Sequence, residues 1–433
     1  MSDTAAFKSY QTYKTHNYET RTIRLDSPML HIGLEVSSLN PFEYVQTASK
    51  VYFPNTEALA QAFYHQGGRF LQDYVNAIEE KRSIEPLLEQ AFGDDWQNAK
   101  SPDGQKIFPQ VRSKWTLEEG ERITDLRPMI RNGMGDLYVP GSSIKGAIRT
   151  AIAYFLLKYD KKYKPPQPLS EVERKIRQGI ASGEFKSRFN QKWADDGLFM
   201  DDIFTNCSLS YQGRSVKARN GPNTDFMRAI SVSDSQPLRR KTIKLKSGKQ
   251  AKKNIPVVAE VIVSSHFQDQ NAKYRASIYT EMVRNVRTEF TITLDREMLS
   301  WFKHNSNMQI PFETVEDLLR ICKDFAQDQW KNEANYWSEI NNNYHQGKNL
   351  DFNVLWDKFY SNPTCPYDLR IGWGTGLFGT TISGLLDDDL RSQLRDICGI
   401  KAPGFQAPKS RRTIVSSRNE IVYVPGWVKF TPR

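Results

Sequence analysis

Cysteine and long apolar runs are scarce in this sequence of 433 residues. Its four cysteines, Cys207, Cys322, Cys365 and Cys398, lie far apart and form no Cys-x-x-Cys pair, which argues against a zinc ribbon and against a disulfide framework. The longest purely apolar run, residues 151–157, has seven residues, whereas a membrane-spanning helix needs about 20. No apolar secretory signal is visible at the N-terminus. We therefore expect a globular protein of the reducing cytoplasm, without a membrane partner.

Catalytic and metal-binding patterns are equally sparse. The six histidines form no pair at metal-ligand spacing, and neither a Gly-x-Ser-x-Gly motif nor a set of kinase motifs occurs. Acidic pairs stand at residues 195–196 and 201–202, and an acidic triplet at 387–389 precedes an expected helix, where capping is the simpler explanation. We therefore predict no metal, no cofactor and no catalytic residue. An isolated His31 or an aspartate stays open as the acid or base of a ribonuclease.

Positive charge is in excess, with 60 Lys and Arg against 50 Asp and Glu, and it is segregated. Residues 239–253 hold eight basic residues and no acid, and the last 33 residues carry seven basic residues against one acid. Segregated basic blocks are typical of a surface that binds a polyanion. We take Lys244, Lys246 and Lys249 as candidate contacts; a solubilising hairpin and tail is the alternative.

Apolar periodicity predicts a mixture of helices and strands, an α+β protein without strict βα alternation. Helices are expected at residues 56–66 (capped by Asn55), 69–92, 144–155, 170–182 and 311–340, the last within a mostly helical insertion that reaches about residue 360. Residues 20–26 and 288–295 alternate as strands do. Two further strand candidates flank Ser247-Gly248, which suggests a long basic hairpin with residues 255–263 after the turn.

The clearest helix begins in the segment VPGSSIKGAIR, residues 139–149. Ser142 or Ser143 can cap it, which leaves free backbone N–H groups and the positive end of the helix dipole facing outward. Lys145 and Arg149 are four residues apart, so both project from one side of the helix, away from its apolar stripe. This arrangement is typical of a phosphate-binding helix N-terminus with two cations beside it. A capped helix with two exposed cations is the alternative.

A second constellation is rich in glycine, with five glycines between Gly372 and Gly384. Three of them satisfy the Gly-x-Gly-x-x-Gly spacing, but a dinucleotide site is unsupported because the preceding segment is short and polar and no βαβ unit surrounds it. Glycines also let the backbone lie flush against a ligand, and a polynucleotide backbone explains the basic blocks as well. The candidate residues of this loop are Gly372, Trp373, Gly374, Thr375, Gly376 and Gly379.

The segment VPGSSIKGAIRTAI resembles the Pro-Gly-Ser-Ser-hydrophobic-Lys-Gly-x-hydrophobic-Arg signature of RAMP proteins, the RNA-binding subunits of CRISPR effector complexes. IGWGTGLFGTTI is similar to their C-terminal glycine-rich loop, and SPMLHIG, FMRAISVSDS and IYTEMVRNVRTEF are similar to other RAMP segments. With the closing PKSRR and VPGWVKF, the order is most similar to the fifth-subunit family of type III-A (Csm) complexes. That family caps the complex and binds the 3′ part of the CRISPR RNA.

The resemblance implies two ferredoxin-like (RRM-like) domains with helical insertions, at residues 1–225 and 226–433, the second with the basic hairpin, the helical insertion and the glycine-rich loop. It assigns RNA contact to Ser142, Ser143, Lys145, Arg149 and the glycine-rich loop. The sequence departs from the family at Glu35, where the opening strand often has glycine. The aromatic signature of RRM sheets is also absent, so base stacking on the sheet is not expected.

The leading hypothesis is a non-catalytic subunit that binds the 3′ region of a CRISPR RNA and caps the filament of backbone subunits in antiviral defence. Its expected partners are the CRISPR RNA, a neighbouring RAMP backbone subunit, the small Csm subunit and, indirectly, target RNA. One alternative is a metal-independent RAMP endoribonuclease that processes precursor RNA, with His31 as acid or base. The other is a different RAMP subunit, either the 5′-handle cap or a backbone subunit.

Overall fold

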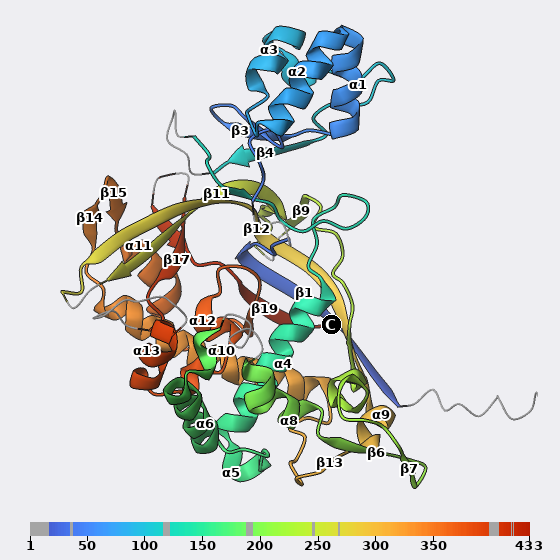
Figure 1. Cartoon of the computed structure of the whole chain (residues 1–433), viewed down its shortest axis with the longest axis vertical. Helices are drawn as coiled ribbons and strands as arrows, with labels where there is room; N and C mark the ends of the chain where they lie inside the picture. The colour runs from blue at the N-terminus through green and yellow to red at the C-terminus, as the bar shows by residue number, and fades with distance from the viewer. Residues whose placement is uncertain are drawn as a thin grey trace, which may run out of the picture.

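The computed structural model describes residues 17–34, 38–115, 122–187, 194–244, 247–266, 269–397, 407–416, 418 and 420–433. A twelve-stranded, mostly antiparallel sheet forms the centre of the molecule, and helices α4 (Gly141–Lys158) and α10 (Val315–Glu339) pack against it (Figure 1). The predicted α+β class is confirmed. Strands from both predicted domains pair within this one sheet, and the division after residue 225 stays a prediction.

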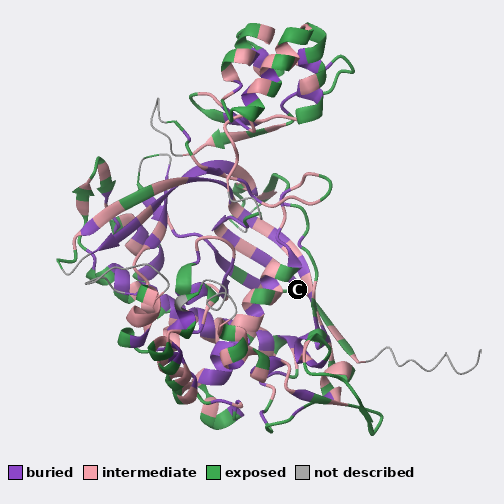
Figure 2. Cartoon of the chain, in the orientation of Figure 1, coloured by how far each residue is buried: buried purple, intermediate pink, exposed green. Residues whose placement is uncertain are grey.

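The sheet is organised around one long strand, β12 (Ala272–Asp295), which pairs with β1 (Tyr18–Leu30) on one side and β11 (Ile255–His266) on the other. The expected strands 20–26 and 288–295 are thus parts of longer ones. Figure 1 shows β11 and β12 curving over the centre of the molecule, and Figure 2 shows how much of them is buried. The other strands of this sheet are β2 (Val45–Gln46), β3 (Lys50–Phe53), β4 (Gln110–Lys114), β5 (Leu126–Arg127), β8 (Ile230–Val232), β16 (Leu369–Arg370), β17 (Arg411–Val415), β18 (Ile421–Tyr423) and β19 (Trp427–Pro432).

One face of the sheet is covered by the main hydrophobic core, in which side chains of β1 and β12 meet α4 and α10. Helix α10 is capped by Thr314, whose hydroxyl accepts from the N–H of Asp317, and its aromatic residues Phe325 and Trp330 are buried. Lys158 at the end of α4 forms ion pairs with Asp324 and Asp328 of α10, which join the two helices. The helical spacing in the sequence therefore marked the core correctly.

Helices α1 (Thr56–Gln66), α2 (Gly68–Glu79) and α3 (Glu85–Phe92) form a separate lobe with its own core, at the top of Figure 1. Asn55 caps α1 as predicted, because its Oδ1 accepts from the N–H of Glu57 and Ala58. The single helix expected over 69–92 is wrong: Lys81 adopts a left-handed conformation (φ 52°) that ends α2. The lobe joins the sheet through β3 and β4.

Further helices and strands complete the described part of the chain. They are α5 (Asp160–Tyr163), α6 (Leu169–Ser182), α8 (Asp201–Phe204), β6 (Cys207–Tyr211), β7 (Arg214–Val216), β9 (Lys241–Lys244), β10 (Gln250–Lys253), α9 (Arg296–Trp301), β13 (Phe302–His304), β14 (Asn343–His345), β15 (Lys348–Leu350), α11 (Asn353–Leu355), α12 (Gly376–Thr380) and α13 (Asp388–Ile397). Asp387 accepts from the N–H of Leu390, as the capping interpretation of the acidic triplet predicts. Within the described ranges, no helix is long and apolar enough to cross a membrane. Cys207, Cys322 and Cys365 are buried free thiols, and Cys398 lies outside those ranges.

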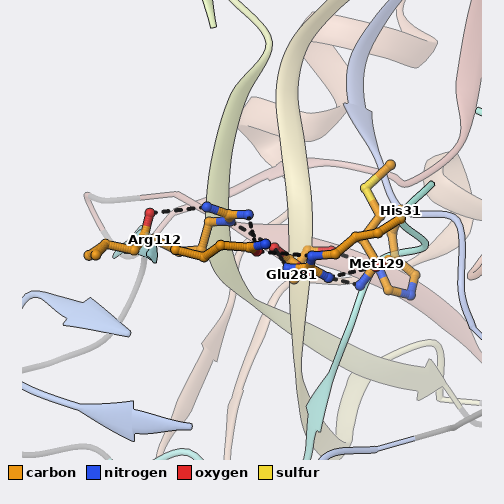
Figure 3. Close-up of polar contacts among 7 residues, drawn as sticks. His31, Arg112, Met129 and Glu281 are labelled. Atoms are coloured by element: carbon orange, nitrogen blue, oxygen red, sulfur yellow. Dashed lines mark hydrogen bonds and ion pairs between the residues drawn. The ribbon is translucent and has the colours of Figure 1, made fainter. Parts of the chain in front are cut away.

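A buried carboxylate on β12 joins the lobe to the sheet (Figure 3). Glu281 is fully buried, and its Oε1 accepts from Arg112 of β4 and from Arg131, each at 2.7 Å. Its Oε2 accepts from the backbone N–H of Met129 at 3.0 Å. The carboxylate therefore satisfies two guanidiniums and a backbone amide, and it keeps β4 and the segment after β5 against the central strand.

Replacing Glu281 should release this attachment. In Glu281→Ala, Arg112 and Arg131 keep their charges but lose their common partner, so we expect a loss of about 3 kcal/mol in the free energy of unfolding. The matched control is Glu80→Ala, which breaks an ion pair with Arg82 whose two side chains are each 60% exposed, and should cost under about 1 kcal/mol. Urea unfolding measures both. Equal losses in the two variants would contradict the role given to Glu281.

Candidate nucleic-acid interface

The start of α4 differs from the prediction. Pro140 stands at the N-cap position without a side-chain cap, so capping by Ser142 or Ser143 is wrong. Asp234 takes that place, because its Oδ1 accepts from the N–H of Gly141 at 2.8 Å. A carboxylate of the same chain thus occupies the N-terminus of α4. It interacts with the positive end of the helix dipole, where an external anion was expected. Ser142 is exposed and Ser143 half-buried.

The two cations of α4 have different surroundings. Arg149 forms an ion pair with Asp225 (Nη1 to Oδ2, 2.6 Å), and its guanidinium lies 3.8 Å from the centre of the Phe204 ring. Lys145 has no ion-pair partner among the described residues, and its half-burial lowers the pKa of its ammonium. Arg149 is thus engaged within the chain, whereas phosphate contact by Lys145 and Arg149 stays a prediction.

The glycine-rich loop approaches its own chain at two positions. Gly372 (φ 83°) lies so close to the carbonyl oxygen of His31 that an added Cβ would stand 2.3 Å from it. Gly374 (φ 86°) faces Pro425, and an added Cβ would stand 2.7 Å from the Cγ atom of that proline. Gly376 (φ 74°) has no atom within 4 Å of an added Cβ and is exposed. Internal packing thus requires the first two glycines, whereas Gly376 alone of these three faces open space.

The other loop residues are mostly structural. Thr375 is buried and donates from its hydroxyl to the carbonyl of Gly372, and Gly379 packs against Thr375. Trp373 is half-buried, and its ring meets the guanidiniums of Arg127 (5.3 Å) and Arg412 (5.1 Å). Sequence reasoning did not select these two arginines individually. The basic closing segment was the one signal, and it pointed only to Arg412.

A cavity of about 590 Å³ lies between helix α4, which the first motif begins, and the glycine-rich loop. Thr150 and Ala153 from α4 line one part of it, and Gly376 and Leu377 from the loop line another. Arg412 of β17 also lines the cavity and links it to Trp373. Segments more than 200 residues apart in the sequence therefore form one mostly apolar cavity, whose lining also holds the basic side chains of Arg391, Arg395, Lys409 and Arg412. The candidate residues Ser142, Ser143, Lys145 and Arg149 do not line it.

His31, which stayed open as a catalytic acid or base, has a structural role. Its side chain is 1% exposed, and its Nδ1 donates to the carbonyl oxygen of Glu281 at 2.7 Å. Burial lowers the pKa of the imidazole to about 4, so the ring is neutral at physiological pH. A buried neutral imidazole does not suit a ribonuclease acid or base. The described residues also contain no group of three or more His, Cys, Asp or Glu that could hold a metal ion.

The basic block forms a hairpin, but not the one expected. Strands β9 and β10 pair with each other, whereas residues 255–263 belong to β11 in the main sheet. In this short hairpin Lys241 stands opposite Lys253, and Lys244 and Lys249 are exposed; Lys246 lies outside the described residues. Lys241 and Lys253 are thus one like-charge pair across the hairpin, and the carboxylate of Asp26 interacts favourably with Lys253.

These features define a class. The chain belongs to the RAMP superfamily, whose family model matches residues 22–378. Within it, the chain is similar to Csm5 of type III-A CRISPR systems, which confirms the predicted resemblance. The CRISPR system protein Csm5 of Enterococcus italicus is 31% identical over 104 residues, which cover 21% of this chain and 30% of that relative.

Two solved structures share the fold over nearly the whole chain. A chain of a Csm–crRNA–target RNA ternary complex of a type III-A system has 21% identity and a TM-score of 0.60, with 95% of this chain and all of the other covered. Csm5 of T. onnurineus has 19% identity and a TM-score of 0.53, with 94% of this chain and all of the other covered.

Alanine at two glycines should separate internal packing from an open site. In Gly372→Ala both the positive φ and the contact with His31 oppose the new methyl group, so we expect a loss of more than about 2 kcal/mol in stability. In Gly376→Ala only the conformational strain acts, about 1 kcal/mol. Thermal unfolding and an RNA gel shift test both variants. Gly376→Ala should lose relatively more RNA binding than stability, and the reverse result would make Gly376 a simple turn residue.

The two cations of α4 can be tested in the same way. Lys145→Ala should change the free energy of unfolding by less than about 0.5 kcal/mol. It should also flatten the slope of log K for RNA binding against log salt concentration by about 0.7. Arg149→Ala leaves the Asp225 carboxylate without its partner, so it should cost about 2 kcal/mol of stability. A stable Arg149→Ala variant that has lost RNA binding would restore Arg149 as an RNA contact.

Proposed function

We propose that this protein is a non-catalytic RNA-binding subunit of a type III-A (Csm) effector complex, which binds the 3′ region of the CRISPR RNA and caps the filament of backbone subunits in antiviral defence. Its partners in this role are the CRISPR RNA, a neighbouring RAMP backbone subunit and the small Csm subunit, with target RNA met indirectly. The proposal extends the similarity to Csm5 and to a chain of an RNA-containing Csm complex.

The observation that carries the proposal is that α4, the helix which the first RAMP motif begins, and the glycine-rich loop line one cavity, with Arg391, Arg395, Lys409 and Arg412 also in its lining. Lys145 lies two turns before Ala153 on α4, and the cavity is lined by Ala153, by the open Gly376 and by Arg412. Such a surface binds a polynucleotide backbone through its phosphates and leaves the sequence to be read by base pairing of the guide.

A catalytic role has weak support in comparison. The histidine considered as acid or base, His31, is buried and neutral, and it is used to hold the backbone beside Glu281. A general acid or base must reach the proton it transfers, which a side chain 1% exposed does not do. We therefore expect precursor RNA to stay intact on incubation with the purified protein, with and without EDTA.

The direct experiment uses the assembled complex. We expect a complex reconstituted with this subunit to protect a longer 3′ segment of the CRISPR RNA from nuclease than a complex reconstituted without it. Sequencing of the protected fragments locates the difference. A change confined to the 5′ end would favour the 5′-handle cap instead, and cleavage of the precursor by the subunit alone would favour the endoribonuclease.

The hairpin of β9 and β10 supplies a further test. Lys244→Ser combined with Lys249→Ser should weaken the binding of two unrelated RNA sequences equally and flatten the salt slope by about 1.4. The matched control is Lys100→Ser with Lys106→Ser, an exposed lysine pair opposite each other in the α1–α3 lobe, which should leave binding unchanged. Loss for one sequence alone would indicate base readout, and equal effects in both double variants would reduce the hairpin to general surface charge.

A further inference from the structure

The second face of the sheet has a different covering from the first. A small cluster on β1, β11, β12 and β17 consists of Met29, Val257, Ala259, Val261, Met282 and Ile414, and no residue of the described helices belongs to it. Three half-buried aromatic side chains pack around it, and they are Trp115, Trp373 and Tyr423. Trp115 follows β4, Tyr423 ends β18 and Trp373 lies in the glycine-rich loop, so aromatic rings from three separate segments gather on this face. Tyr423 also meets Phe359 and Lys358 of the helical turn Trp356–Tyr360.

Each tryptophan on this face has an arginine beside it. The guanidinium of Arg284 lies 4.8 Å from the centre of the Trp115 ring, and those of Arg127 and Arg412 lie 5.3 and 5.1 Å from that of Trp373. Trp115 and Tyr423 stack on each other with ring centres 5.8 Å apart and planes at 29°. Rings and guanidiniums thus form two groups beside the apolar cluster, Arg284 with Trp115 and Tyr423, and Trp373 with Arg127 and Arg412.

These arginines are poorly compensated. Arg284 and Arg412 have no ion-pair partner among the described residues, and Arg127 has only Asp125 at 3.8 Å. The Nε of each of the three is buried without a hydrogen-bond partner. Burial, with Arg127 and Arg370 nearby, lowers the pKa of Arg412. Partly buried guanidiniums with unsatisfied donors are unfavourable in an isolated chain, and an external anion with several acceptor oxygens would satisfy them.

We propose that this face binds a short single-stranded RNA segment, with phosphates at Arg127, Arg284 and Arg412 and with bases against Trp115 and Tyr423. The proposal deepens the proposed function and rests on it. Phosphate alone would need the arginines but not the stacked rings. A phosphopeptide would pair with the arginines but has no row of flat rings to stack on the aromatic side chains. RNA bases, in contrast, stack on both aromatic rings and guanidinium planes.

The site was not expected because the usual RRM aromatic signature is absent from the sequence. Here the rings come from the segment after β4, from β18 and from the loop before α12, so no single strand carries the pattern. Trp373 is the positioning residue of the group: its backbone N–H donates to the carbonyl of His31 at 3.0 Å, and its ring contacts the guanidiniums of Arg127 and Arg412.

The test uses the full chain and fluorescence anisotropy with two probes, a labelled 12-nucleotide oligouridine and an abasic strand of the same length. Trp115→Leu with Tyr423→Leu should weaken oligouridine binding about tenfold and leave abasic binding unchanged, because the rings contact bases only. Arg284→Met and Arg412→Met should weaken both probes and each flatten the salt slope by about 0.7. Trp115→Phe, which keeps a ring, should recover most of the affinity for oligouridine.

The matched controls are Tyr64→Leu and Arg69→Met in the α1–α3 lobe, whose side chains are highly exposed; both should bind like the wild type. Thermal unfolding of every variant verifies that it is folded. Unchanged oligouridine binding in the folded ring variants, or an equal loss for both probes, would overturn the site while the wild-type affinity for RNA still supports the proposed function. No RNA binding by the wild-type chain or its complex would overturn both.

Discussion

The buried carboxylate of Glu281 is the interaction on which the rest of the structure depends. Its oxygens hold Arg112 and Arg131, which attach the α1–α3 lobe and the segment after β5 to the central strand. Its backbone carbonyl accepts from His31, and the carbonyl of His31 accepts from Trp373 of the glycine-rich loop. One position on β12 thus connects the lobe, the end of the opening strand and the candidate interface. A buried charge requires all of its partners, so these parts must assemble together.

The two faces of the sheet divide the tasks of stability and binding. On one face, apolar residues of β1 and β12 are covered by α4 and by the first half of α10, up to Phe325. Trp330 and Trp337 of α10 pack in a separate cluster with Tyr360 and Trp427. On the other, aromatic rings and arginines take the place of helices around a small apolar cluster. Arg284 and Arg412 have no carboxylate partner among the described residues, so they contribute little to the stability of an isolated chain, and a polyanion would complete their arrangement. The fold therefore keeps its hydrophobic stabilisation on the face opposite the proposed ligand.

Local patterns predicted the elements well where one chemical signal was sufficient. Helical spacing identified α4 and α10, and Asn55 was recognised as a cap because its side chain bonds to its own next turn. The same reasoning failed at Ser142 and Ser143, because Asp234, which is distant in the sequence, accepts from the N–H of Gly141 at the N-terminus of α4. The sequence pattern also predicted a hairpin between the basic run and residues 255–263. This was wrong, because local alternation does not reveal that β11 pairs with β12.

By itself the sequence determined the family, the α+β class, the basic character and the positions of the two RAMP motifs, because these depend on composition and on residues close in the chain. Only the tertiary structure decided which motif residues are available. It joined Arg149 to Asp225, placed Gly372 against His31 and left Gly376 open. It also brought Trp115, Arg284 and Tyr423 together from three strands or strand ends. Such contacts arise between segments far apart in sequence, and no local periodicity records them.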